Sequence, residues 1–379
     1  MKNTFRQGII LLFVLCFVAY AQNDNEILKT FSASAGENLQ MSVDPGNIDI
    51  KTWNKNEVKI EVVSRKKYEV EDLVAKKTGS TIKFILELDE GWNNNITVKV
   101  HAPSNFNFDL ETTGGNINIG DPVTGELKAE TEGGNVNFND VNGKVSVNTS
   151  GGNISGDNVE GDVSLHTSGG NISLGNVKSG KSEVNTYGGN ISVGNVDSDL
   201  SAKTQGGNLS VGNVGGNANV FTYGGHISID KVSGSASMET YGGHLNLEGA
   251  SGKVIAKTMG GHINLENITG SISASTKGGH VNAELDPKPN TSSSLETSGG
   301  HMSLDIPSSA KATIEVLVEN DDLDYEDPHE ILKSDFPAAK FDVDKDNYEI
   351  RATYILNGGG AKINLKCVGG HVKIAKWHK

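Results

Sequence analysis

The sequence predicts an all-β fold: a single-chain, β-helix-like β-solenoid with coils of about 18 residues and irregular β regions capping both ends. Three observations predict it: a recurring Thr-x-Gly-Gly-[Asn/His] motif, apolar residues that alternate with polar ones on both sides of it, and glycines at a regular interval. The chain has 47 glycines and only eight prolines. Because these glycines are periodic, we interpret them as corners of a repeat and not as a flexible linker.

The repeat is defined by paired glycines spaced 18 to 21 residues apart, each pair preceded two positions earlier by a threonine. The pairs begin at Gly114, Gly133, Gly151, Gly169, Gly188, Gly206, Gly224, Gly242, Gly260, Gly278 and Gly299. After each pair comes an alternating stretch such as Ile172-Ser173-Leu174, then a turn often marked by Val-x-Gly, then a second alternating stretch. Such a unit cannot bury its own apolar face, so we expect equivalent strands to stack in register at ~4.8 Å. Propeller blades repeat at ~40 residues and do not fit.

The corner residues of this repeat have a structural interpretation. Glycine permits a positive φ or a close approach of two backbones, and the inward threonine hydroxyl is placed to satisfy amides of the turn. The residues assigned to this role are Thr186, Gly188, Gly189, Asn190, Thr222, Gly224, Gly225, Thr240, Gly242 and Gly243.

The two ends of the chain predict export and capping. Lys2 and Arg6 precede a short apolar run, and small residues at Ala19 and Ala21 predict a signal peptide, residues 1–21, cleaved before Gln22. Lipidation at Cys16 is the alternative, disfavoured because Cys16 lies inside the apolar run. We expect an N-terminal β cap at 22–110, the solenoid at 111–305, and a C-terminal β cap with an acidic loop at 306–379. The compartment stays open between periplasm, cell surface and medium.

Charge and cysteine content exclude several classes of protein. Removing the signal peptide takes two positive charges with it, so the net charge changes from −14 to −16. This disfavours nucleic-acid binding, which requires clustered Lys and Arg. No second apolar stretch is long enough for a transmembrane helix. Cys367 is then the only cysteine, so we expect no intramolecular disulfide and a small buried side chain there.

The mature chain resembles the bacterial putative-adhesin family of β-strand-repeat proteins of unknown function. The matching features are Gly46-Asn47-Ile48-Asp49-Ile50, the Ala102-Pro103 step into Phe108-Asp109-Leu110-Glu111-Thr112, the serial Thr-x-Gly-Gly-Asn-Ile units, and the terminal Gly369-Gly370-His371-Val372 strand. The resemblance implies an exported protein with a β-helix-like fold, and it brings no catalytic residues.

The position after each glycine pair changes from asparagine to histidine along the chain. It is Asn116, Asn135, Asn153, Asn171, Asn190 and Asn208, then His226, His244, His262, His280 and His301, with His371 in the terminal unit. The favoured interpretation is a ladder of stacked, hydrogen-bonding corner residues. The alternative is a divalent transition-metal site or an acid sensor built from His226, His244, His262, His280 and His301. Adjacent imidazoles would repel when protonated, so we expect a lowered pKa and weakening by acid.

Aromatic residues precede three glycine pairs: Tyr187, Tyr223 and Tyr241, with Phe221 close by. Exposed aromatics on a regular surface can hold a sugar or a protein partner, but such residues also commonly fill solenoid corners, and we favour the filling role. The acidic run from Asp321 to Asp327 is interpreted as a solvated charge run.

The predicted function is non-enzymatic. The chain has no nucleophile elbow, phosphate-binding loop or zinc-hydrolase motif, and its outward strand positions are mostly Ser and Asn. We expect an exported adhesin-like interaction or envelope scaffold protein with a cell-surface glycan or a protein as partner, of open oligomeric state. The alternatives are a metal-binding or pH-responsive envelope protein and, last, a carbohydrate-active β-helix enzyme.

Overall fold

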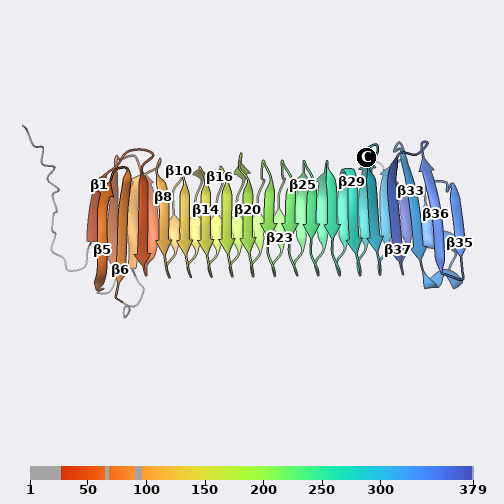
Figure 1. The fold of residues 1–379 in the computed structure, drawn as a ribbon, viewed down its shortest axis with the longest axis horizontal. Helices are drawn as coiled ribbons and strands as arrows, with labels where there is room; N and C mark the ends of the chain where they lie inside the picture. The colour runs from red at the N-terminus through yellow and green to blue at the C-terminus, as the bar shows by residue number, and fades with distance from the viewer. Residues whose placement is uncertain (1–26, 65–67, 90–95, 378–379) are drawn as a thin grey trace, which may run out of the picture.

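The structure, a computed structural model, describes residues 27–64, 68–89 and 96–377. The predicted signal peptide lies outside the described residues. Strands lie side by side along one long axis and run across it (Figure 1). The described residues form a short 3-10 helix, η1 (Asp321–Asp324), and a short α-helix, α1 (Pro328–Ile331), and neither is long or apolar enough to cross a membrane.

Each regular coil has three sides, joined by corners, and equivalent sides of successive coils form parallel sheets. The first side, sheet A, consists of β3 (Asn47–Trp53), β7 (Ile96–Pro103), β9 (Ile117–Ile119), β12 (Val136–Phe138), β15 (Ile154–Gly156), β18 (Ile172–Leu174), β21 (Ile191–Val193), β23 (Leu209–Val211), β25 (Ile227–Val232), β27 (Leu245–Ala250), β30 (Val281–Pro287), β32 (Met302–Pro307) and β38 (Val372–Trp377). The facing side, sheet B, consists of β2 (Asn38–Asp44), β6 (Thr81–Leu88), β8 (Asn107–Thr112), β11 (Leu127–Thr131), β14 (Val145–Thr149), β17 (Val163–Thr167), β20 (Ser182–Thr186), β22 (Leu200–Lys203), β24 (Ala218–Phe221), β26 (Ala236–Glu239), β28 (Lys253–Lys257), β31 (Ser292–Thr297), β37 (Ala361–Val368) and β33 (Ala312–Glu319). One long strand, β29 (Ile263–Thr276), runs through both sheets.

The third side is narrow, and it occupies the segment that the repeat pattern predicts to be a turn. It consists of β10 (Val123–Thr124), β13 (Val141–Asn142), β16 (Val159–Glu160) and β19 (Val177–Lys178), continued by single bridges through Val196, Val214 and Val232. The valine of each Val-x-Gly segment points inward and is buried, as at Val141 and Val159. The coils that contain β10, β13, β16 and β19 therefore have three strands where two were expected, and the coils of Val196 and Val214 have a single bridge on that side.

Successive coils stack without a register shift from β9 to β29, and the next pairing in sheet A, β29 with β30, shifts register between Leu265 and Ile268. Ile172 pairs with Ile191, and Thr149 pairs with Thr167, so equivalent repeat positions lie directly beside each other. The inward columns are buried Val, Ile, Leu and Ala, and the interior is narrow: Gly156 leaves the space that the Phe138 ring fills, since a Cβ on Gly156 would lie 2.1 Å from that ring. The predicted β-solenoid is confirmed.

Antiparallel strands close both ends of the stack. At the N-terminal end these are β1 (Ile27–Ser32), β4 (Glu57–Ser64) and β5 (Val70–Thr78). At the C-terminal end they are β35 (Lys340–Asp344) and β36 (Glu349–Leu356), beside the short β34 (Leu332–Ser334). The final strands β37 and β38 do not lie at the tip: they pair with β31 and β32, so the terminal Gly-Gly-His unit forms the next coil of the stack.

The two glycines of each pair have different roles. A Cβ on the second glycine would lie 1.8 to 2.2 Å from the carbonyl oxygen of the matching glycine one coil earlier, so two backbones touch there. None of the pairs from Gly114 to Gly300 has a positive φ; Gly369, at φ 67°, is the exception in the terminal unit. Of the two reasons proposed for glycine, close approach is therefore correct for the regular coils and positive φ is wrong.

Replacing Gly134 by alanine is expected to lower the free energy of unfolding by about 3 kcal/mol, because the added methyl overlaps the Gly115 carbonyl and forces two coils apart. Gly133→Ala is the matched control, since nothing lies within 4 Å of its Cβ position. Urea denaturation followed by circular dichroism measures both. Equal losses in the two variants would contradict the assigned role of the second glycine.

Candidate functional site

The corner threonines form a continuous buried hydrogen-bonded column. Thr222 Oγ donates to the carbonyl of Gly207 in the preceding coil at 2.9 Å and accepts from the amide of Gly225 at 3.3 Å. Its side chain is fully buried, so these contacts satisfy polar groups that water cannot reach. Thr186 and Thr240 make the same pair of contacts in their coils.

In the terminal coil, Cys367 stands in the threonine position. It is fully buried, as expected, and its Sγ lies 3.3 Å from the Gly300 carbonyl. Burial raises the pKa of the Cys367 thiol to about 11, so the group stays protonated at neutral pH and is a poor nucleophile.

The asparagine column is a ladder in which each side chain caps the next coil. Asn171 Oδ1 accepts from both the backbone amide of Asn190, at 2.8 Å, and its Nδ2, at 3.2 Å. The ladder begins earlier than the sequence analysis placed it, because Asn47 makes the same contacts to Asn116.

The histidine ladder continues this column with ring nitrogens in place of amide oxygens. The backbone amide of His262 donates to His244 Nδ1 at 2.8 Å, and the same contact links every neighbouring pair at 2.8 to 3.0 Å from His226 to His371. Ring centroids are 4.7 to 5.2 Å apart, and the rings from His226 to His301 are stacked within 14° of parallel. At the end of the ladder His371 Nε2 lies 3.1 Å from Glu326.

This geometry determines the tautomer. A nitrogen that accepts an N–H carries a lone pair and no proton, so each imidazole that accepts from the next coil is neutral with its proton on Nε2. The lone pair that a metal ion would need is engaged in the ladder. In the described ranges, no three or more His, Cys, Asp or Glu side chains are grouped as metal ligands would be.

Burial, and then the neighbouring imidazoles His262 and His226, lower the pKa of His244 below its usual value. His280 behaves alike, with burial first and then His262 and His301 lowering its pKa. Both shifts favour the neutral form that the ladder hydrogen bonds require.

The stability of the solenoid is therefore expected to fall in acid. Because the folded pKa of His244 and His280 is lowered, their contribution is fully present above the unfolded value of about 6.5 and is lost as the pH falls through the folded pKa. The urea midpoint should decrease between pH 7.5 and pH 5. The His244→Asn/His280→Asn variant should lose part of this decrease, since asparagine fills the same position without titrating, whereas His166→Asn, outside the ladder, should retain it.

A second asparagine ladder was missed. Asn158, Asn176, Asn195 and Asn213 each place their backbone amide 2.9 to 3.1 Å from the side-chain oxygen of the preceding member, starting at Asp140. The available signal was an Asp or Asn immediately before the inward valine, recurring every 18 or 19 residues.

The tyrosines are exposed, and the favoured prediction that they fill corners is wrong. The exposed fractions of Tyr187, Tyr223 and Tyr241 are 52%, 50% and 43%. Tyr223 and Tyr241 stack on each other at 5.3 Å, and Phe221 meets the Tyr223 ring edge-on at 4.9 Å. The corners are closed instead by the threonines and the second glycines.

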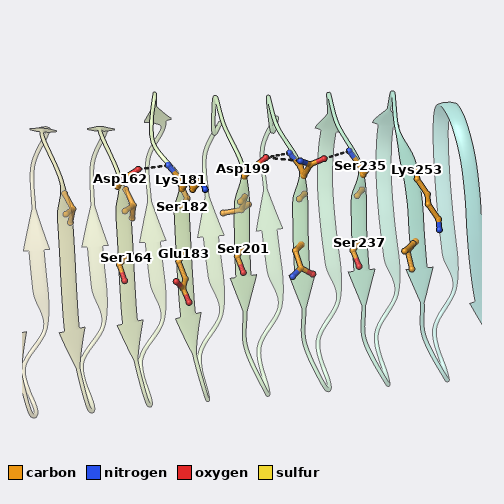
Figure 2. A pocket seen from close by; sticks show the side chains of 18 of the residues that line it. Asp162, Ser164, Lys181, Ser182, Glu183, Asp199, Ser201, Ser235, Ser237 and Lys253 are labelled. Atoms are coloured by element: carbon orange, nitrogen blue, oxygen red, sulfur yellow. Dashed lines mark hydrogen bonds between the residues drawn. The ribbon is translucent and has the colours of Figure 1, made fainter.

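The outer face of sheet B carries a long trough with a volume of about 620 Å³ (Figure 2). It crosses seven strands, from β14 to β28, and so extends roughly 30 Å at the usual strand spacing. Two rows of outward-pointing side chains, one residue per strand, border the trough. The floor of the trough is the backbone between these rows, where side chains such as Val163 and Leu200 point into the core.

The trough combines small polar side chains with balanced charge. Ser164, Ser201 and Ser237 lie in one bordering column. Three lysines and three acids line it: Lys144, Lys181, Lys253, Asp162, Glu183 and Asp199. Some of these groups also hold the stack together, since Asp162 accepts from the amide of Lys181 at 2.9 Å. The lining therefore carries no net formal charge.

These features define a class of protein: a parallel β-solenoid held by side-chain ladders, with an open outer face available for binding. The chain matches the family model described as Toastrack DUF4097 over residues 37–239 and 198–322. Since these stretches cover most of its length, the chain belongs to that family, and the resemblance drawn from its repeats is confirmed. No curated protein matches it.

Three solved bacterial structures are similar. A putative adhesin from Bacteroides fragilis NCTC 9343 has 16% identity and a TM-score of 0.35, covering 59% of this chain and 98% of that one. A putative adhesin from Parabacteroides distasonis ATCC 8503 has 13% identity and a TM-score of 0.24, covering 75% and 98%. A putative cell adhesion protein from Clostridium sporogenes ATCC 15579 has 10% identity and a TM-score of 0.14, covering 93% and 99%.

Proposed function

We propose that this chain is an exported, non-enzymatic, adhesin-like protein that binds an extended partner on the outer face of sheet B. One observation carries the proposal: the trough runs across seven hydrogen-bonded strands on a surface held rigid by the ladders. The similar structures from B. fragilis and P. distasonis are described as putative adhesins, which is consistent with this role.

The face favours binding over catalysis. A hydrolase of the β-helix type would need a pair of carboxylates at a reacting bond, or a base close to a nucleophile. In the trough the acids alternate with lysines and serines, and Asp162 and Asp199 are already engaged as acceptors for amides of the next coil. We therefore assign no catalytic residue.

The adhesin-like role is tested with beads coated with the predicted mature chain, residues 22–379. Coated beads should be retained on bacterial cells and on mucus-coated surfaces several-fold better than beads coated with the heat-unfolded chain, because binding requires the ordered outer face. Retention equal to that of the unfolded chain would overturn the proposal. A parallel reducing-sugar assay on polysaccharides should show no release of product.

Metal binding on the histidine ladder is the second candidate, and the structure provides a specific test of it. Zinc would have to compete for Nδ1 lone pairs that already accept backbone amides. Calorimetric titration with Zn²⁺ and Cu²⁺ should therefore show no tight binding at pH 7.5. Tight binding that disappears in His244→Asn/His262→Asn would establish the metal role and contradict the tautomer assigned here.

A further inference from the structure

The large exposed apolar side chains of the regular coils fall in one column. Among the described residues from 112 to 305 they are Tyr187, Tyr223, Tyr241 and Met259, and all four occupy the position immediately before a glycine pair. The fold does not demand a large residue there, since equivalent coils carry Ser150, Ser168 or Gln205. An exposed aromatic cluster without a structural role marks a binding surface.

Two of these tyrosines border a hollow that is separate from the trough. It has a volume of about 340 Å³ and lies around Gln205. Gln205 belongs to the coil that lies between the coil of Tyr187 and the coil of Tyr223. We call it the Gln205 hollow. His166 and Phe221 also line it, and each meets a tyrosine ring edge-on, His166 with Tyr187 at 5.7 Å and Phe221 with Tyr223 at 4.9 Å.

The spacing of the hollow suits one ring-shaped group. Tyr187 and Tyr223 are two coils apart, which places their backbones about 10 Å from each other along the axis. A ring midway between them would lie about 5 Å from each along the axis, close to the usual carbon–carbon contact separation of about 4 Å. The smaller Gln205 side chain, in the intervening coil, provides the opening.

The polar groups that line the Gln205 hollow are complementary to a ligand with hydroxyl groups and not to a charged ligand. Gln205 offers an amide donor and an amide acceptor, Asn185 offers only its Nδ2 because its Oδ1 is buried without a partner, and Lys203 is the single formally charged side chain of the lining. Asn185 Nδ2 already donates to Glu183 at 3.0 Å, which places a carboxylate beside the hollow and offsets that lysine. An apolar ring face bordered by amides is complementary to a pyranose, which has C–H faces and hydroxyl edges.

The backbone weighs against a protein strand as the occupant. Protein partners often add a strand to a free sheet edge, but β20, β22 and β24 are each paired on both sides. A partner at the hollow must therefore be held by side chains alone.

We propose that the Gln205 hollow is a saccharide-binding subsite for a neutral glycan, in which one pyranose unit is held between Tyr187 and Tyr223 and hydrogen-bonded by Asn185 and Gln205. The inference rests on the proposed binding function and adds to it a second site, separate from the trough, with the class of its ligand. A longer glycan would extend along the solenoid axis, past Tyr241, which stacks on Tyr223.

The test measures binding of short neutral oligosaccharides of hexose and N-acetylhexosamine units to residues 22–379, by calorimetry and by NMR of the tyrosine rings. A uronic-acid oligosaccharide serves as the charged comparison. At least one neutral oligosaccharide should bind and shift the Tyr187 and Tyr223 signals. Tyr187→Ala/Tyr223→Ala should weaken that binding about tenfold or more, while Tyr187→Phe/Tyr223→Phe retains most of it.

Tyr325→Ala is the matched control, because Tyr325 is 89% exposed but lies in the C-terminal cap. It should bind like the unchanged chain, and circular dichroism should show all variants folded. Absence of binding to every neutral oligosaccharide, or binding that the double alanine variant leaves unchanged, would overturn the subsite. Bead retention that persists in the double alanine variant, together with either result, would show that the adhesin-like role is correct and the assigned ligand wrong.

Discussion

The structure depends on the contact between backbones at the second glycine of each pair. There the carbonyl of one coil lies where a Cβ of the next would be, at 1.8 to 2.2 Å from that position. The contact allows neighbouring coils to approach to the strand spacing at this corner, and the threonine hydroxyl satisfies the polar groups that this approach buries. Register, ladders and outer columns all follow from it.

Because equivalent residues of successive coils lie in register, their side chains form the asparagine and histidine ladders. These ladders make the solenoid rigid and its surface chemically uniform. Oδ1 of asparagine and Nδ1 of histidine serve the same purpose, accepting the amide of the next coil, so the column changes residue at His226 without changing geometry. The difference lies in titration: an amide oxygen remains an acceptor at every physiological pH, whereas an imidazole ceases to be one when protonated. At the position after each glycine pair, the coils that carry histidine, from His226 onward, are therefore sensitive to acid, and the earlier coils that carry asparagine are not.

The corner that follows each strand of sheet B is where the repeat becomes irregular. Inward columns remain small and apolar, and the threonine and second-glycine positions hardly vary, because each is constrained by a contact with the coil before it. The position between them varies freely, from Ser168 to Tyr187 to Gln205, since its side chain points to solvent. Variation at an unconstrained outward position, concentrated as aromatics around one hollow, is the basis for placing the ligand there.

The sequence by itself determined the fold class, the coil length and the asparagine and histidine columns, because a motif that occurs eleven times at intervals of 18 to 21 residues has few physical solutions. The tertiary structure decided what depends on neighbours distant in the chain. Cys367 and His371 lie directly against a coil about 70 residues earlier. The reason is that β37, near the end of the chain, lies between β31 of the solenoid and β33 of the cap and pairs with both. The Val-x-Gly segments proved to be a third side because each pairs with its equivalent in the next coil, and the tyrosines proved exposed because threonine and glycine already close the corner. Which imidazole nitrogen is engaged follows only from the placement of the next coil's amide.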